Sequence, residues 1–171
     1  IQEHLLPRQM PDCGHFRIFG RIVSMGELGG DYFDYFNTSE GRFSLLIGDV
    51  AGRGAGAALI MAMAKAAIMQ FSDVVEKPQV LAMRLHDLIQ AAGKRTRKTM
   101  ITQYLNLNGI DGKGIYTNAG GWPPLIVNQN SGEVREITLP GPMLGALKNP
   151  RFDAVEIALQ PGEALIFYSD G

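Results

Sequence analysis

Three aspartates stand where apolar segments begin or end, which is a suitable place for a metal ligand. Asp31 follows two glycines, Asp49 ends the apolar run 43–48, and Asp170 ends the apolar run 165–168. Carboxylates at strand ends suit Mg²⁺ or Mn²⁺, which take oxygen ligands and often keep several waters. An aspartate in this position also commonly does no more than open a turn, so each of the three has this second interpretation.

A glycine-rich turn follows Asp49. Its residues Gly52-x-Gly54-x-x-Ala57 nearly match the dinucleotide-binding pattern G-x-G-x-x-G/A. A dinucleotide fold needs parallel strands joined by crossover helices, and only one strand-to-helix step here has that character. The carboxylates of Asp31 and Asp49 would also repel a bare polyphosphate. We therefore interpret the turn as serving Asp49: it exposes the carbonyl of Val50 and starts a helix close to the sheet.

The predicted elements run as strands, two consecutive helices, and strands again. This order favours an α+β fold with antiparallel sheets over alternating βαβ units. Helices are expected after Gly56 and from Pro78. Strands are expected over residues 16–23, 31–36, 43–48, 100–107, 114–118, 125–127, 134–137, 154–157 and 164–168.

The helix after Gly56 is rich in alanine, and its larger apolar side chains include Leu59, Met63 and Met69. Small side chains on most faces let such a helix lie close to a sheet. We interpret the methionines as filling the core, because flexible Met side chains suit irregular gaps.

Composition narrows the function further. The 171 residues carry 16 basic and 17 acidic side chains, so the net charge of −1 gives no argument for nucleic acid or for membrane contact by this domain. The basic run 94–98 is interpreted as a solvated loop. Cys13 is the single cysteine, which suits a reducing, cytoplasmic location, and no signal peptide is visible.

Several sequence blocks together resemble a known family. They are Ile1-Gln2-x-x-Leu5-Leu6-Pro7, Gly29-Gly30-Asp31-Tyr32-x-Asp34, Gly48-Asp49-Val50-Ala51-Gly52-Arg53-Gly54 with Ala57-Ala58, Asn118-Ala119-Gly120-x-x-Pro123-Pro124, Leu144-Gly145 and Pro161-Gly162-Glu163-x-Leu165-x-x-Tyr168-Ser169-Asp170-Gly171. In order and spacing they resemble the SpoIIE/RsbU-like branch of the PPM (PP2C-type) metal-dependent protein phosphatases. Any single block would be weak, but the resemblance runs from the first residue to the last.

The resemblance implies a PP2C-like α/β/β/α sandwich of two antiparallel sheets flanked by helices, with two Mn²⁺ or Mg²⁺ ions at one end. By motif match, Asp49 would bridge the ions and the carbonyl of Val50 would bind one of them. Asp31 and Asp170 would be further ligands, and Asp34 would lie behind them. The reaction would be hydrolysis of phosphoserine or phosphothreonine on a protein, by a water that the two cations activate.

Three departures from the family pattern qualify this expectation. Family members usually carry a further Asp well beyond the Asp-Gly motif, and this chain stops at Gly171, so we expect its C-terminal part to be missing. The block Asn-Ala-Gly-His-x-Pro has Gly121 in place of histidine. No histidine follows Val50 as in eukaryotic members, so no general acid is evident. His4, His15 and His86 share no ligand spacing and are expected at the surface or in a satisfied core.

Two functions follow from this pattern. The leading one is a serine/threonine phosphatase domain over residues 1–171, with residues 1–7 ending a linker helix from an upstream domain. Its substrate would be a phosphorylated STAS-type anti-sigma-factor antagonist. Arg53 would steer the phosphorylated loop of this substrate toward the metal ions, or its side chain would simply be solvated. The alternative is a catalytically degenerate PP2C-fold module that regulates by binding a protein. A homodimer is one arrangement considered, and the sequence does not decide the oligomeric state.

Overall fold

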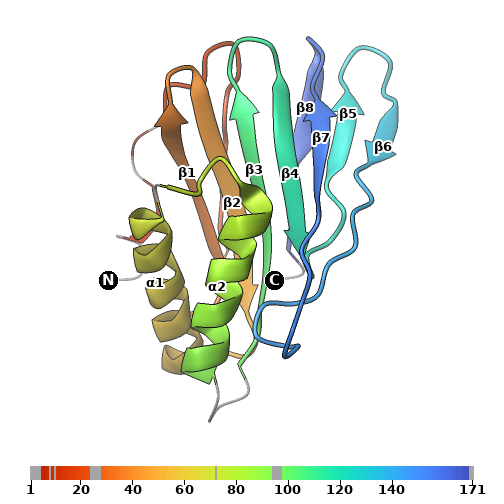
Figure 1. The fold of residues 1–171 in the computed structure, drawn as a ribbon. Coiled ribbons are helices and arrows are strands. Elements are labelled where there is room, and N and C mark those ends of the chain that lie inside the picture. Colours follow the sequence, from red (N-terminus) through yellow and green to blue (C-terminus); the bar gives the residue numbers. More distant parts are fainter. Residues whose placement is uncertain are drawn as a thin grey trace.

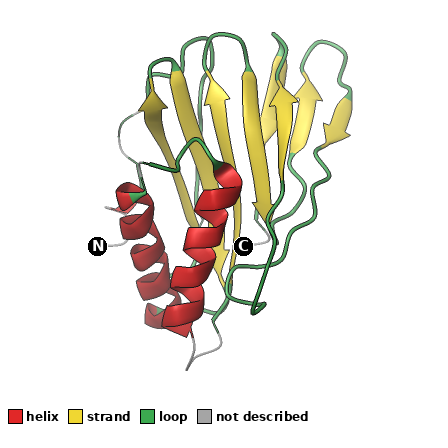
Figure 2. Cartoon of the chain, viewed as in Figure 1, coloured by secondary structure: helices red, strands yellow, loops and turns green. Residues whose placement is uncertain are grey.

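A computed structural model describes residues 5–7, 9, 11–23, 28–71, 73–93 and 98–169. The elements are, in chain order, β1 (Tyr32–Ser39), β2 (Arg42–Val50), α1 (Ala55–Gln70), α2 (Pro78–Gly93), β3 (Met100–Asn108), β4 (Lys113–Ala119), β5 (Leu125–Asn128), β6 (Val134–Glu136), β7 (Ala154–Ala158) and β8 (Glu163–Ile166). This is the predicted order of strands, two helices and strands (Figure 2).

The strands form two antiparallel sheets. The first has five strands in the order β1-β2-β3-β4-β7, and the second has three in the order β6-β5-β8. Both helices of the described part cover one face of the five-stranded sheet, and the second sheet lies against its other face (Figure 1). The molecule is therefore layered as helices, sheet and sheet.

Two apolar clusters fill the two interfaces between these layers. The cluster under the helices joins Tyr32, Leu46 and Tyr104 of the sheet to Leu81 and Leu85 of α2. The cluster between the sheets includes, from the strands, Phe43, Leu105, Leu107, Tyr116 and Ile126. Successive side chains of a strand point to opposite faces, so odd-numbered residues of β2 face the second sheet and even-numbered ones face the helices.

The two helices form for different local reasons. Alanine gives α1 a high intrinsic helix propensity, and Gly54, with φ of 74°, precedes its first turn without a side-chain cap. Pro78 opens α2, where its missing N–H costs no helical hydrogen bond. In the described residues no helix is long and apolar enough to cross a membrane.

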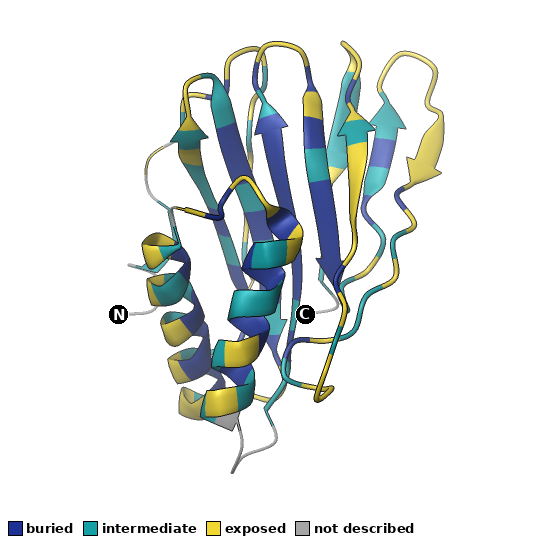
Figure 3. Ribbon diagram, in the orientation of Figure 1, coloured by how far each residue is buried: buried dark blue, intermediate teal, exposed yellow. Residues whose placement is uncertain are grey.

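Two expectations about packing are wrong. Residues 16–23 alternate as expected, and Phe16 and Ile18 pack on the cluster between the sheets, but they form no ladder with another strand. On α1, Leu59, Met63 and Met69 are exposed rather than buried. The buried side of α1 consists of Ala57, Ile60, Met61, Ala64 and Ile68 (Figure 3).

Candidate metal centre

Asp31 and Asp49 come together through the pairing of β1 with β2. Tyr32 pairs with Gly48, and the N–H of Val50 donates to the carbonyl of Gly30 at 3.3 Å. The register of the pair therefore continues beyond Tyr32, the first residue of β1. Asp31 therefore lies opposite Asp49, where directly paired residues have Cβ atoms about 5 Å apart. By the alternation of the strands, both carboxylates lie on the face toward the second sheet.

Gly30 lets the backbone that leads into β1 approach the oxygens of this site closely. A Cβ at position 30 would clash with the carbonyl oxygen of Val50 and would lie 2.7 Å from Oδ1 of Asp49. A backbone carbonyl and a carboxylate oxygen thus lie on the same side of Gly30. This donor set suits a hard divalent cation, which prefers oxygen ligands, so the residues present fit the expected metal.

The end of the chain also reaches this edge of the sheet. The hydroxyl of Ser169 donates to Oδ1 of Asp31 at 3.3 Å. Asp31 and Ser169 share a small cavity of about 250 Å³ with Ile47 and Phe167. Asp170, the predicted further ligand, lies outside the described residues.

The loop that follows Val50 is held by the segment that leads into β3. The N–H of Ala51 donates to the carbonyl of Thr99 at 2.9 Å, and the Lys98 ammonium donates to the carbonyl of Ala51 at 2.7 Å. Arg53, the predicted substrate-steering residue, is exposed on this loop. Sequence reasoning missed this contact, because it interpreted the whole basic run 94–98 as solvated and nothing in that run distinguishes Lys98.

The structure does not bring Asp34 to this site. It lies on the helix-facing side of β1, where Oδ2 accepts hydrogen bonds from the Tyr32 hydroxyl at 2.5 Å and from Lys65 of α1 at 2.6 Å. Burial, and then the neighbouring Asp34 carboxylate, raise the pKa of the Tyr32 phenol well above its usual range. Asp34 thus belongs to a buried polar cluster between β1 and α1.

The place of the missing histidine is filled from β3. A Cβ on Gly121 would lie 2.6 Å from Cγ of Gln103, so the Gln103 side chain covers this position. Asn118 closes the turn, since its amide donates to the carbonyl of Gly121 at 2.9 Å and its oxygen accepts from the Gly121 N–H at 2.8 Å. This block therefore has a clear structural role here.

Neither of the two histidines that the structure describes joins the aspartates. His4 lies outside the described residues, and His15 is exposed. His86 is buried on α2, where its Nδ1 accepts from the N–H of Gly145 at 3.0 Å. In the part of the chain that the structure describes, no three His, Cys, Asp or Glu side chains gather as a metal site.

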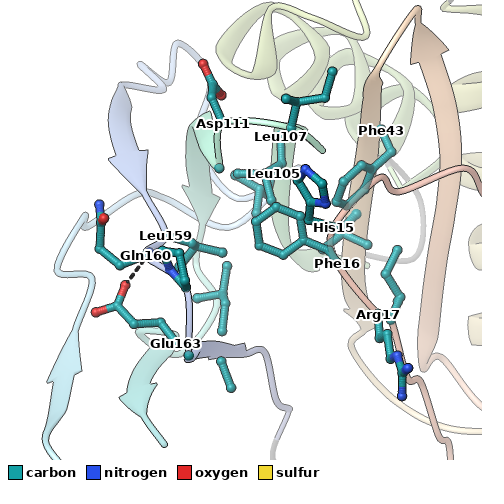
Figure 4. Close-up of a pocket in the computed structure, with 18 of the residues that line it drawn as sticks. His15, Phe16, Arg17, Phe43, Leu105, Leu107, Asp111, Leu159, Gln160 and Glu163 are labelled. Carbon is teal, nitrogen blue, oxygen red and sulfur yellow. Dashed lines mark hydrogen bonds between the residues drawn. The ribbon is translucent and has the colours of Figure 1, made fainter. Parts of the chain in front are cut away.

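A second, larger cavity is a separate feature. It has a volume of about 680 Å³ and lies between the sheets, with Phe16, Phe43, Leu105 and Leu107 among the side chains that line it (Figure 4). Phe43 is at the start of β2 and Asp49 is near its end, so this cavity lies far along the strand from the paired aspartates.

Comparison with known proteins gives a family for this chain. The model of the family described as Stage II sporulation protein E (SpoIIE) matches residues 39–171. The phosphoserine phosphatase RsbU of Bacillus subtilis (strain 168) is 24% identical over 172 residues, which cover 100% of this chain and 50% of RsbU. The chain spans between about a third and a half of the length of the curated relatives it matches.

Solved structures confirm the predicted fold. The RsbU and RsbW domains of Rv1364c from Mycobacterium tuberculosis match with a TM-score of 0.66 and 28% identity, over 87% of this chain and 41% of that one. The PP2C phosphatase domain of SpoIIE from Bacillus subtilis matches with a TM-score of 0.70 and 17% identity, over 85% of this chain and 41% of that one. The chain thus has the α+β, PP2C-like fold.

Proposed function

The chain belongs to the SpoIIE family, and from that premise we propose that it is a metal-dependent serine/threonine phosphatase domain of a bacterial signalling protein. The observation that carries the proposal is the pairing of Asp31 with Asp49, with the carbonyl of Val50 close beside the Asp49 carboxylate at Gly30. The name of RsbU, a phosphoserine phosphatase, supports the same reaction.

Asp49, Asp31 and the carbonyl of Val50 would hold Mn²⁺ or Mg²⁺, and Asp170 would be a further ligand by its match to the family motif. When bound, two such ions would supply Lewis acidity toward the phosphoryl group and activate water for in-line attack. The protein's own contribution is to fix the ligands. Gly30, which has no side chain, lets the Val50 carbonyl and the Asp49 carboxylate lie close to its backbone, and Ser169 orients Asp31 through its hydrogen bond to Oδ1.

The same residues explain why the cations would be needed. Two paired carboxylates at one sheet edge concentrate negative charge, which repels the dianionic phosphoryl group of a substrate. Cations held between them would reverse the sign of that interaction. We further propose that the substrate is a phosphorylated STAS-type anti-sigma-factor antagonist, on the strength of the family resemblance.

The test is hydrolysis of p-nitrophenyl phosphate and of a phosphoserine protein by the full chain with Mn²⁺. Asp49→Asn should lower activity by at least about 100-fold, because changes behind metal ligands already cost 10–100-fold. Asp111→Asn is the matched control. Asp111 is exposed in the β3–β4 turn, its Oδ1 accepts from the Lys113 N–H at 2.9 Å, and asparagine keeps that oxygen, so activity should not change.

The alternative function is binding without catalysis. One observation favours it: Gln103 occupies the position of the missing histidine. If wild type and Asp49→Asn are equally inactive at saturating Mn²⁺ while both still bind the phosphoprotein, the phosphatase proposal is wrong and the binding module is favoured.

A further inference from the structure

We infer that Lys98 is a positioning residue that fixes the metal-binding end of β2, an inference that rests on the function proposed above. Lys98 as a residue is half-buried, and its ammonium donates to the carbonyl of Ala51 at 2.7 Å. Ala51 is the residue directly after Val50, whose carbonyl would bind a cation. A surface lysine seldom keeps one partner, since fixing its long side chain costs rotamer entropy.

The backbone that carries Lys98 is itself anchored. Met100 pairs with Leu144 through two hydrogen bonds of 3.1 Å and 2.8 Å, and with Val50 across the β2–β3 ladder. A Cβ on Gly145 would lie 3.2 Å from the Lys98 carbonyl oxygen, so the 144–145 turn packs closely on Lys98. The ammonium thus extends from a fixed base rather than from a free loop.

Gly52 makes room for the Lys98 ammonium. Its φ is 98°, a conformation that favours glycine, and any Cβ at this position would clash with Nζ of Lys98. Gly52 was predicted as part of the turn that exposes the carbonyl of Val50 and starts a helix close to the sheet. The structure adds that its missing side chain admits a cation against the loop backbone.

Residues 98 and 99 together fix two consecutive peptide planes. A trans peptide is planar and points its C=O and N–H in opposite directions. Since the Ala51 N–H bonds to Thr99, the Val50 carbonyl in the same plane is directed away from β3 and toward Gly30. Lys98 holds the next plane through the Ala51 carbonyl. Without this bond the loop could rotate, and the Val50 carbonyl would turn away from the metal site.

Two effects of Lys98 on a cation have opposite signs, which makes the inference testable. A positive charge near a divalent cation weakens cation binding through Coulomb repulsion. If charge were its whole effect, removing Lys98 would therefore tighten Mn²⁺ binding. If positioning dominates, removing Lys98 weakens binding, because the Val50 carbonyl is no longer held in place.

The experiment measures Mn²⁺ affinity of the full chain from the electron paramagnetic resonance signal of free Mn²⁺. Lys98→Met, which keeps the aliphatic stem, should weaken Mn²⁺ binding by about 10-fold, the lower end for residues that orient ligands. Lys98→Arg keeps a cationic donor and should stay within about threefold of wild type. Without metal, hydrogen exchange at the amides of residues 51–53 should be faster in Lys98→Met.

Arg53→Met is the matched control, because Arg53 is a cation on the same loop that forms no hydrogen bond or ion pair with any other described residue. It should leave Mn²⁺ affinity unchanged or slightly tighter. If wild type binds Mn²⁺ and Lys98→Met binds it equally well or more tightly, the inference about Lys98 is wrong. The phosphatase proposal is unaffected by that result. Failure of wild type to bind Mn²⁺ at all overturns both.

Discussion

Gly30 shows how a missing side chain can define a site. The carbonyl of Val50 and the carboxylate of Asp49 both face its Cα, and a Cβ there would clash with the carbonyl. A side chain at position 30 would therefore displace these two oxygens directly. Gly29, the preceding residue, differs sharply, since its Cβ would approach nothing closer than the Asp31 nitrogen at 3.9 Å.

We predict that Gly30→Ala weakens Mn²⁺ binding by at least about 10-fold, in the range found for changes beside metal ligands. The same change should lower the free energy of unfolding by about 1–3 kcal/mol through overpacking. Calorimetric Mn²⁺ titration and urea unfolding measure the two effects. Gly29→Ala is the control and should bind Mn²⁺ as wild type does. Equal affinities for both variants would show that the oxygens beside Gly30 do not bind the cation.

Residue spacing predicted part of this site. Asp31 and Asp49 are 18 residues apart, enough for a strand, a hairpin and a second strand, and the structure pairs them across β1 and β2. Asp34 was expected near them, but it is an odd number of residues from Asp31 and so points to the other face of the strand. That parity was readable from the sequence. The contact of Lys98 with Ala51 was not, since it joins segments 47 residues apart.

Among the elements, α1 and β1 are joined by a buried ion pair. Lys65 and Asp34 are 2.6 Å apart, with side chains only 17% and 7% exposed, and the Lys65 ammonium also lies 5.7 Å from the centre of the Tyr32 ring. Asp34 accepts from the Tyr32 hydroxyl as well. A carboxylate buried this deeply needs its partners, because an unpaired buried charge is costly.

We predict that Lys65→Met lowers the free energy of unfolding by about 3–5 kcal/mol, the usual cost of breaking a buried pair from one side. Arg84→Met is the control, since the Arg84–Asp73 pair is 2.7 Å long but exposed at 40% and 59%. It should cost less than about 1 kcal/mol. Urea unfolding of both variants gives the comparison, and equal losses would mean that the Lys65–Asp34 pair is not buried in solution.

The side of α1 that faces the sheet could not be predicted from its sequence. Almost every face of this helix is apolar or small, so no single stripe marks the side toward the sheet. The large residues Leu59, Met63 and Met69 point outward, while Ala57 and Ala64 face the sheet and allow close packing. By contrast, α2 has a clear stripe, and Leu81, Leu85 and Ile89 are buried as their spacing predicts.

At the scale of the whole molecule, local sequence patterns predicted where the strands lie better than they predicted which strands pair. Alternation and turn residues located the eight strands, because these signals lie within each segment. The same alternation over residues 16–23 predicted a strand that has no ladder. A strand depends on a neighbouring backbone, and the sequence of the segment itself does not specify that neighbour.

Three buried tyrosines make the stability of the protein depend on pH in the alkaline range. Burial raises the pKa of Tyr32, Tyr104 and Tyr116 above the ordinary tyrosine value of about 10, and Asp34 raises the pKa of Tyr32 further. Below pH 10 each phenol is protonated in both folded and unfolded chains, so its contribution is fully present. Above pH 10 the unfolded chain releases protons that the folded chain keeps, and stability falls.

We predict that the free energy of unfolding is unaffected by these groups up to about pH 10 and then declines by up to about 4 kcal/mol per pH unit, about 1.4 for each tyrosine. Urea unfolding between pH 8 and pH 12 measures this slope. Tyr116→Phe removes one of the three phenols and should reduce the slope by about a third, whatever it does to stability at pH 8. Tyr116 donates to Oε1 of Gln103 at 3.0 Å between the sheets, so an unchanged slope would mean that this phenol reaches solvent in the folded protein.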